Sequence, residues 1–166
     1  MPNFIEQKVL ELNRTLPYES AGVFRFFVSP ELLEQWSAPD TMTLEVPKME
    51  ARKEGEYRYI HADKAGAQWV CEGHFKDFQR NVRLVTLDTV TNPKGELVLK
   101  DLETIVDFKD FGGTTEVHIR MKGFKDLSSM RDCKQGWTQC LDKLEPLMAM
   151  EGSHHHRRIH QENARV

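Results

Sequence analysis

Cysteine and histidine are the residues in this chain that could bind a metal ion, but their spacing keeps them apart. Cys71 and His74 are three positions apart in a predicted strand, so their side chains point to opposite faces. Cys133 and Cys140 are two turns apart on a predicted helix, about 10 Å, which is too far for one ion. The sequence therefore predicts no metal site. The three cysteines are expected to be reduced thiols.

Side chains that could exchange protons with a substrate are predicted to face outward. They are Glu72, His74, Asp107 and His118. No Gly-x-Ser-x-Gly elbow occurs in the sequence. The tripeptide Asp110-Phe111-Gly112 lacks the glycine-rich phosphate loop of a kinase, so we interpret it as a turn. We therefore expect binding rather than catalysis, and no cofactor.

Polar side chains on predicted inward faces could orient a bound molecule. They are Tyr57, Tyr59, His61, Thr104 and Thr115. Burial of a polar group costs free energy unless the group is paired, so an unpaired one would select a polar atom of a ligand. The alternative is that these groups are exposed or form hydrogen bonds within the protein, as most buried polar groups do.

An amphipathic helix is predicted over residues 128–145, and it carries one large aromatic side chain. Its apolar residues recur at steps of three and four and are Cys133, Trp137, Cys140, Leu141, Leu144 and Leu147. Gly136 lowers the helix propensity beside Trp137, which suggests a close approach to another element. A helix laid over a curved sheet leaves a cavity wherever the side chains between them do not fill the space.

The sequence also predicts how this helix begins and ends. Ser128 or Ser129 is expected to cap it, with Asp132 as the acidic residue of a capping box. Pro146 is expected to end or kink it. Residues 151–166 are polar without periodicity, so we expect a disordered polar tail after a single domain of residues 1–150.

Strands and turns alternate between residues 41 and 123. Six strands are predicted, at residues 41–48, 55–62, 67–78, 82–91, 97–109 and 114–123. Glycine with asparagine or aspartate marks the tight turns, which make neighbouring strands antiparallel. In the last strand Val117, Ile119 and Met121 alternate with polar residues, so one face of the sheet is expected to be buried.

A first strand is predicted at residues 4–14, followed by two short helices. The first helix covers residues 18–28, and the second begins at Ser29-Pro30, a capping hydroxyl followed by proline. It should end before Pro39. This order predicts an α+β fold in which a curved antiparallel sheet of about seven strands wraps around the long C-terminal helix.

Composition excludes several classes of function. The chain has 166 residues, with 23 basic and 26 acidic side chains, so it lacks the positive charge of a nucleic-acid-binding protein. The sequence contains no run of 18 apolar residues, so no membrane span is predicted. The N-terminal residues do not have the pattern of a signal peptide, so we expect a cytoplasmic protein. A separate expectation is that the protein is a monomer or homodimer.

Four local patterns accompany this order of elements. The first is Pro17, then Val23-Phe24, then Ser29-Pro30-Glu31-Leu32 with Trp36 and Pro39. The second is Glu54-Gly55-Glu56-Tyr57-Arg58-Tyr59, and the third is Gly73 in the next strand. The fourth is Gly136-Trp137, followed at helical spacing by Leu141 and Leu144.

These patterns resemble the START-like (helix-grip, SRPBCC) superfamily, and within it the homologues of the activator of heat shock protein 90 ATPase. The fourth pattern is the most specific, because it matches the family's Gly-Trp-x-x-x-Leu-x-x-Leu helix. The second departs from the family, since Glu54 stands where the family has the first glycine of a pair. The resemblance covers roughly residues 4–148.

The resemblance implies a cavity between the long helix and the sheet, which in many members binds an apolar small molecule. Combined with the inward faces, it predicts these ligand-binding residues: Trp36, Tyr57, Tyr59, His61, Trp69, Cys71, Phe75, Thr104, Val106, Phe108, Val117, Ile119, Met121, Cys133, Trp137, Cys140, Leu141 and Leu144. Ordinary core packing is the alternative for the tryptophans.

Three functions remain open from the sequence. The first is binding of a hydrophobic or aromatic small molecule, lipid-like or polyketide-like. The second is a co-chaperone-type module that stimulates a heat shock protein 90 ATPase and needs an exposed complementary surface. The third is a cyclase-like or hydrolytic enzyme, which needs a buried acid or base with a shifted pKa in the same cavity.

Overall fold

Seven antiparallel strands form one curved sheet in the computed structural model, which describes the backbone of residues 9–163 and the side chains of residues 9–151. The strands are β1 Val9–Leu16, β2 Met42–Met49, β3 Glu56–Asp63, β4 Gln68–Gln79, β5 Arg83–Thr91, β6 Leu97–Asp110 and β7 Thr115–Lys122. Their order across the sheet is β1-β7-β6-β5-β4-β3-β2. Each of β2 to β6 pairs with the strand that follows it, and β1 pairs with β7 at one edge.

The six predicted strands of the meander are confirmed to within one residue at each end. The turns between them contain the predicted combination of glycine with aspartate or asparagine. Gly66 and Gly95 have φ of +87° and +80°, which favours glycine. Asp63 Oδ1 accepts hydrogen bonds from the backbone N–H of two residues in its turn. The first strand ends at Leu16, two residues later than predicted, and residues 4–8 of that prediction lie outside the described residues.

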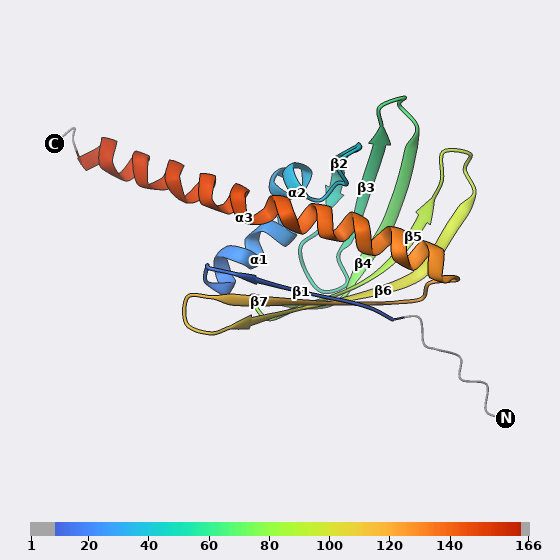
Figure 1. The fold of residues 1–166 in the computed structure, drawn as a ribbon, viewed down its shortest axis with the longest axis horizontal. Helices are drawn as coiled ribbons and strands as arrows, with labels where there is room; N and C mark the ends of the chain where they lie inside the picture. Colours follow the sequence, from blue (N-terminus) through green and yellow to red (C-terminus); the bar gives the residue numbers. More distant parts are fainter. Residues whose placement is uncertain (1–8, 164–166) are drawn as a thin grey trace.

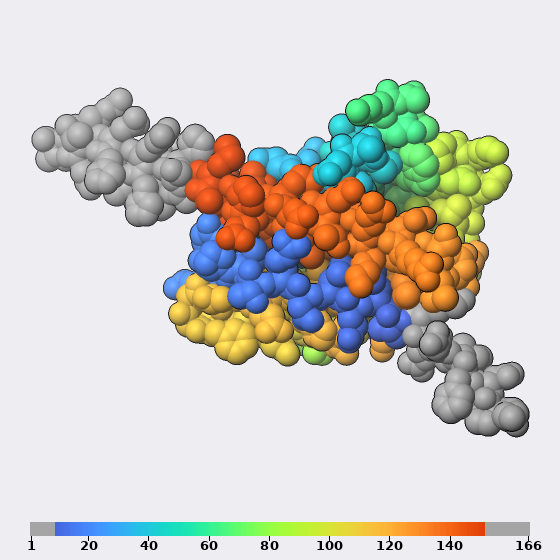
Figure 2. Space-filling model, viewed as in Figure 1, coloured from blue at the N-terminus to red at the C-terminus, as the bar shows by residue number. Residues whose placement is uncertain are grey.

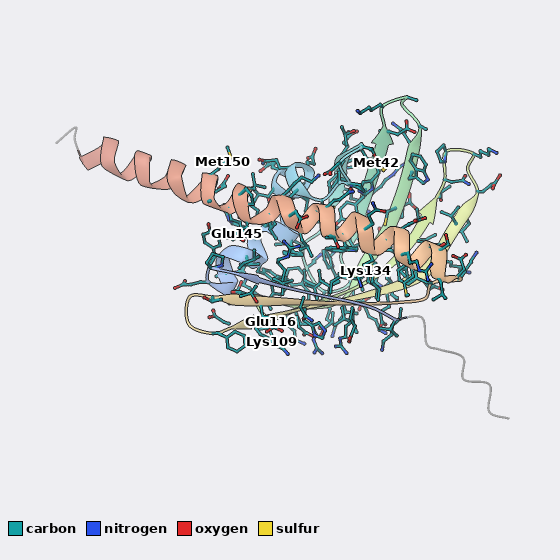
Figure 3. All side chains as sticks on the ribbon, viewed as in Figure 1. Met42, Lys109, Glu116, Lys134, Glu145 and Met150 are labelled. Atoms are coloured by element: carbon teal, nitrogen blue, oxygen red, sulfur yellow. The ribbon has the colours of Figure 1, made fainter. Side chains whose placement is uncertain are left out.

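The predicted alternation separates the two faces of the sheet. In β7 the side chains of Thr115, Val117, Ile119 and Met121 are all buried against the interior. Lys109 of β6 and Glu116 of β7 are neighbours on the outer face (Figure 3). The concave face is therefore the one that the helices cover.

Two short helices carry the chain from one edge of the sheet to the other and close one end of its concave face. They are α1 Ser20–Val28 and α2 Pro30–Trp36. The rings of Phe24 and Phe27 pack edge-on against Phe108, with centroids 5.2 and 5.1 Å away. Pro30 opens α2 as predicted, but Ser29 makes no side-chain capping hydrogen bond, so that part of the prediction is wrong.

The long helix α3, Leu127–Asn163, lies across the concave face (Figure 1). Its side chains contact β1 on one side and α2 on the other, so they cover the interior from this direction (Figure 2). Asp126 caps the helix, because its Oδ1 accepts a hydrogen bond from Ser129 N at 2.7 Å. The prediction that Ser128 or Ser129 is the cap is therefore wrong.

The helix does not end at Pro146, as one reading of the sequence predicts, but continues to Asn163. Proline removes the backbone bond to the carbonyl of Asp142, which is an exposed residue whose carbonyl water can reach. Packing stabilises the helix on both sides, since Leu144 and Met148 are both buried. The backbone of residues 151–163 continues this helix. No helix in the described part of the chain is long and apolar enough to cross a membrane.

Two methionines test whether the turn after Pro146 belongs to the core. Met148 is buried, whereas Met150 is 59% exposed on the side of α3 away from the sheet (Figure 3). We expect Met148→Ala to lower the free energy of unfolding by about 2 kcal/mol, and Met150→Ala to change it by less than about 0.5 kcal/mol. Urea unfolding measures both. Equal effects would show that packing does not hold the helix beyond the proline.

Candidate functional site

A cavity of about 330 Å³ lies between α3 and the concave face of the sheet. This volume is at the lower end of the range for small-molecule pockets. The structure brings together thirteen of the sequence-predicted residues around it: Trp36, Tyr57, Tyr59, His61, Trp69, Cys71, Phe75, Thr104, Val106, Met121, Cys133, Trp137 and Cys140. All three tryptophans of the chain are in this set.

Five other predicted residues lie in the core and not along the cavity: Phe108, Val117, Ile119, Leu141 and Leu144. All five are buried. Phe24 and Phe27 of α1 pack on Phe108, so the end of the sheet under the short helices is filled. The cavity lies toward the other end, between the strands on one side and α3, α2 and the loop after α2 on the other, and Phe27 of α1 borders it.

A row of three residues crosses β3, β4 and β5 on the cavity side: Tyr57 is paired with Gly73, and Gly73 with Asp88. Because Gly73 has no side chain, the Tyr57 hydroxyl passes over it and donates a hydrogen bond to Asp88 Oδ1. A Cβ at position 73 would lie 2.6 Å from the Tyr57 hydroxyl oxygen. The glycine is therefore required for this contact between two strands that are not neighbours.

The Asp88 side chain is partly exposed and forms part of the cavity wall. Burial raises its pKa to about 6, because the charged form loses solvation. Hydrogen bonds from the Tyr57 hydroxyl and the Cys71 thiol favour the charged form and limit the rise. Asp88 is thus mostly ionised at neutral pH and takes up a proton in mildly acidic solution.

The neighbouring groups of β3 and β4 stay protonated. The pKa values of Tyr57, Tyr59 and Cys71 lie well above their ordinary values. Burial is the largest cause, and the negative charge of Asp88 is the second. The rings of Tyr57 and Tyr59 are stacked, with centroids 4.8 Å apart. A thiol held in its protonated form is a poor nucleophile, so Cys71 is suited to donating a hydrogen bond and not to covalent catalysis.

The remaining polar candidates divide into paired and unpaired groups. Thr115 Oγ1 donates to the Tyr18 carbonyl oxygen at 2.7 Å, away from the cavity. Burial lowers the pKa of His61, and its Nε2 donates to the Ser37 carbonyl oxygen at 3.1 Å. Within the described part of the chain, no side-chain hydrogen bond pairs the hydroxyls of Tyr59 or Thr104, both of which line the cavity. These two hydroxyls can meet polar atoms of a ligand.

Helix α3 forms the opposite wall. Trp137 lies beside Trp36, with ring centroids 6.4 Å apart. Gly136 faces the loop before β2, and a Cβ there would lie 3.5 Å from Pro39 Cγ, an ordinary contact. Burial raises the pKa of the Cys133 and Cys140 thiols to about 12 and about 11. All three cysteines are free.

Sequence reasoning missed the contribution of β5. Its inward side chains line the cavity and are Leu84, Thr86, Asp88 and Val90. The period of two would have placed Asp88 on the same face as Leu84 and Val90. The other lining residues that it missed come from the helices, the loop before β2 and β6: Phe27, Leu33, Ser37, Pro39, Leu99, Leu102, Asp132 and Gly136.

Comparison with known proteins gives a family match over most of the chain. The family model described as "Activator of Hsp90 ATPase homolog 1-like protein" matches residues 18–149. No curated protein matches the chain.

Solved structures share the fold at low sequence identity. A protein of Chromobacterium violaceum is 23% identical, covers 84% of this chain and 96% of its own, and superposes with a TM-score of 0.74. An Arthrobacter aurescens protein is 16% identical, with coverage of 87% and 88% and a TM-score of 0.77. The AHSA1 protein of Silicibacter pomeroyi is 14% identical, with coverage of 86% and 99% and a TM-score of 0.76. At these identities the likeness concerns the helix-grip fold alone.

Proposed function

Since this chain belongs to the Activator of Hsp90 ATPase homolog 1-like family, we propose that it uses its helix-grip cavity to bind a hydrophobic or aromatic small molecule. The observation that carries the proposal is the lining of the cavity. Its aromatic side chains come from both walls and are Phe27, Trp36, Tyr57, Tyr59, Trp69, Phe75 and Trp137. Apolar walls with a few polar groups are the general pattern of small-molecule sites.

The acid–base groups favour binding over covalent catalysis. A hydrolytic or cyclase-like enzyme needs a buried acid or base, and Asp88 is such a group. Its neighbours do not complete a nucleophilic site, because the Cys71 thiol stays protonated and His61 is bonded to the Ser37 carbonyl. The proposed setting is the cytoplasm, where the free thiols would remain reduced.

Position 136 offers a matched pair of variants to test the proposal. Gly136→Ala adds one methyl group with room beside Pro39, whereas Gly136→Leu extends a side chain into the cavity. Both raise the helix propensity of α3, so both should fold. With the neutral fluorophore N-phenyl-1-naphthylamine as probe, we expect Gly136→Leu to weaken binding at least about tenfold, and Gly136→Ala to change it by less than about threefold.

Fluorescence titration and the thermal midpoint measure this result, since a ligand that binds only the folded state raises the midpoint. Equal affinity of the two variants would place the probe outside the cavity and contradict the proposal. If no neutral apolar probe binds the unmodified chain while the chain accelerates the ATPase of heat shock protein 90, the co-chaperone-type function replaces it.

A further inference from the structure

We propose that the molecule bound in this cavity carries a protonated amine, which pairs with the Asp88 carboxylate against the aromatic wall. This inference rests on the proposed function and specifies the chemistry of its ligand. It starts from an imbalance of charge. Asp88 and Asp132 both line the cavity, and within the described part of the chain no lysine or arginine does.

The hydrogen bonds that Asp88 receives leave room for a ligand. An ionised carboxylate has about four acceptor positions. The Tyr57 hydroxyl and the Cys71 thiol occupy two of them. Both donors are neutral, so the negative charge of Asp88 is solvated but not neutralised. A buried charge is normally paired with an opposite charge, and a ligand can supply the one that the lining lacks.

The titratable groups that interact electrostatically with Asp88 come from β3, β4 and α3, and they are Tyr57, Tyr59, Cys71, His74 and Cys133. Asp132 of α3 also lines the cavity. The tyrosines and thiols stay protonated and uncharged at neutral pH. His74 lies on the same strand as Cys71 but on its other face, and its charge lowers the pKa of Asp88. The neighbouring residue of β6, Leu102, is not titratable.

The walls beside Asp88 also favour a cation. A positive charge is attracted to the faces of tyrosine and tryptophan rings, most strongly where water is excluded. Tyr59 and Trp69 line the cavity on the sheet side, and Trp137 lines it on the α3 side. Among the lining residues described, His61 is the basic side chain that could carry a positive charge. Burial lowers its pKa, however, and its Nε2 donates a hydrogen bond to the Ser37 carbonyl oxygen. It therefore does not supply the missing charge.

Three probes of one shape test the inference: 1-naphthylmethylamine, 1-naphthylmethanol and 1-naphthoic acid. At pH 7.5 they present a cation, a neutral hydroxyl and an anion on the same ring system. We expect the amine to bind about tenfold more tightly than the alcohol, and the acid to bind most weakly. Asp88→Asn should remove the advantage of the amine, and Asp132→Asn, the control at the other carboxylate, should keep it. Isothermal titration calorimetry measures each dissociation constant.

The pH dependence gives a second readout that needs no variant. At pH 5 Asp88 is mostly protonated, so the amine should bind about tenfold more weakly than at pH 7.5 while the alcohol changes little. The inference is overturned, and the proposed function kept, if the alcohol or the acid binds as tightly as the amine. It is also overturned if Asp132→Asn and not Asp88→Asn removes the preference. If none of the three probes binds although N-phenyl-1-naphthylamine does, the inference alone is overturned, and if that probe does not bind either, the proposed function itself fails.

Discussion

Replacing Gly73 by alanine is expected to lower the free energy of unfolding by about 3 kcal/mol or more, although it adds a single methyl group. The new Cβ would lie 2.5 Å from the Leu87 carbonyl oxygen and 2.6 Å from the Tyr57 hydroxyl oxygen. The first contact is with backbone, so it can be relieved only by moving β4 away from β5. The second displaces the Tyr57 hydroxyl from Asp88, which leaves a buried charge with one donor fewer.

Gly22 is the matched control, because an added Cβ there meets nothing within 4 Å. It lies inside α1, where alanine has the higher helix propensity, so Gly22→Ala should raise the free energy of unfolding by up to about 1 kcal/mol. Urea unfolding of the two variants beside the unmodified chain makes the comparison. A Gly73→Ala protein as stable as the Gly22→Ala protein would mean that the sheet adjusts freely at this row.

Gly73 also shows why the fold could be predicted from the sequence more completely than the site. A strand of the meander is visible locally, through its period of two and its glycine turns. The contact between Tyr57 and Asp88 depends on the register of three strands, which sets two side chains 31 positions apart on one row. No local sequence pattern specifies that register, so the contact between Tyr57 and Asp88 in the cavity could not be predicted from the sequence.

The residue pattern of β5 also makes it difficult to predict that Asp88 faces inward. Leu84, Thr86 and Val90 share its inward face, while Val85 and Leu87 lie on the outer face. With apolar residues on both faces, the hydrophobic pattern does not say which face is buried, and an aspartate is ordinarily assigned to solvent. In β7 the outer residues are charged or polar, so its inward face could be predicted correctly.

Pro146 is a different case, in which a local rule is outweighed by packing. Proline in a helix interior costs about 3 kcal/mol, so ending the helix there is the reasonable sequence prediction. Leu144 and Met148 on either side of it are buried, and Arg25 Nη2 reaches Glu151 Oε2 at 3.0 Å. Contacts with residues far away in the sequence stabilise the helix, and helix propensity does not account for such contacts.

Replacing Asp88 by asparagine is expected to make the protein more stable at neutral pH, by up to about 3 kcal/mol. The pKa of Asp88 is about 6 in the folded protein and near its ordinary value of 3.8 when the chain is unfolded. The folded state therefore binds this proton more tightly. The stability that the proton provides is fully present below about pH 4, is lost as the pH rises through about 6, and stays absent above it.

Asparagine removes this dependence because it does not titrate, and its amide oxygen can still accept the hydrogen bond from Tyr57. The gain in free energy of unfolding should therefore be largest at pH 7.5 and should disappear at pH 4. Asp110 provides a control of opposite sign. Hydrogen bonds from Gly112 N and from the backbone and hydroxyl of Ser20 lower its pKa. Asp110→Asn should destabilise the protein at neutral pH, and this loss should shrink as the pH falls.

Urea unfolding at a series of pH values between 4 and 8 measures both dependences. A carboxylate that lowers the stability of the fold at neutral pH is one whose position in the cavity is explained by binding rather than by packing, as expected of residues that serve a site. Asp88→Asn should then combine a more stable fold with the loss of amine preference. A variant that is less stable than the unmodified chain at pH 7.5 would instead show that the ionised carboxylate, through Tyr57 and Cys71, stabilises the sheet itself.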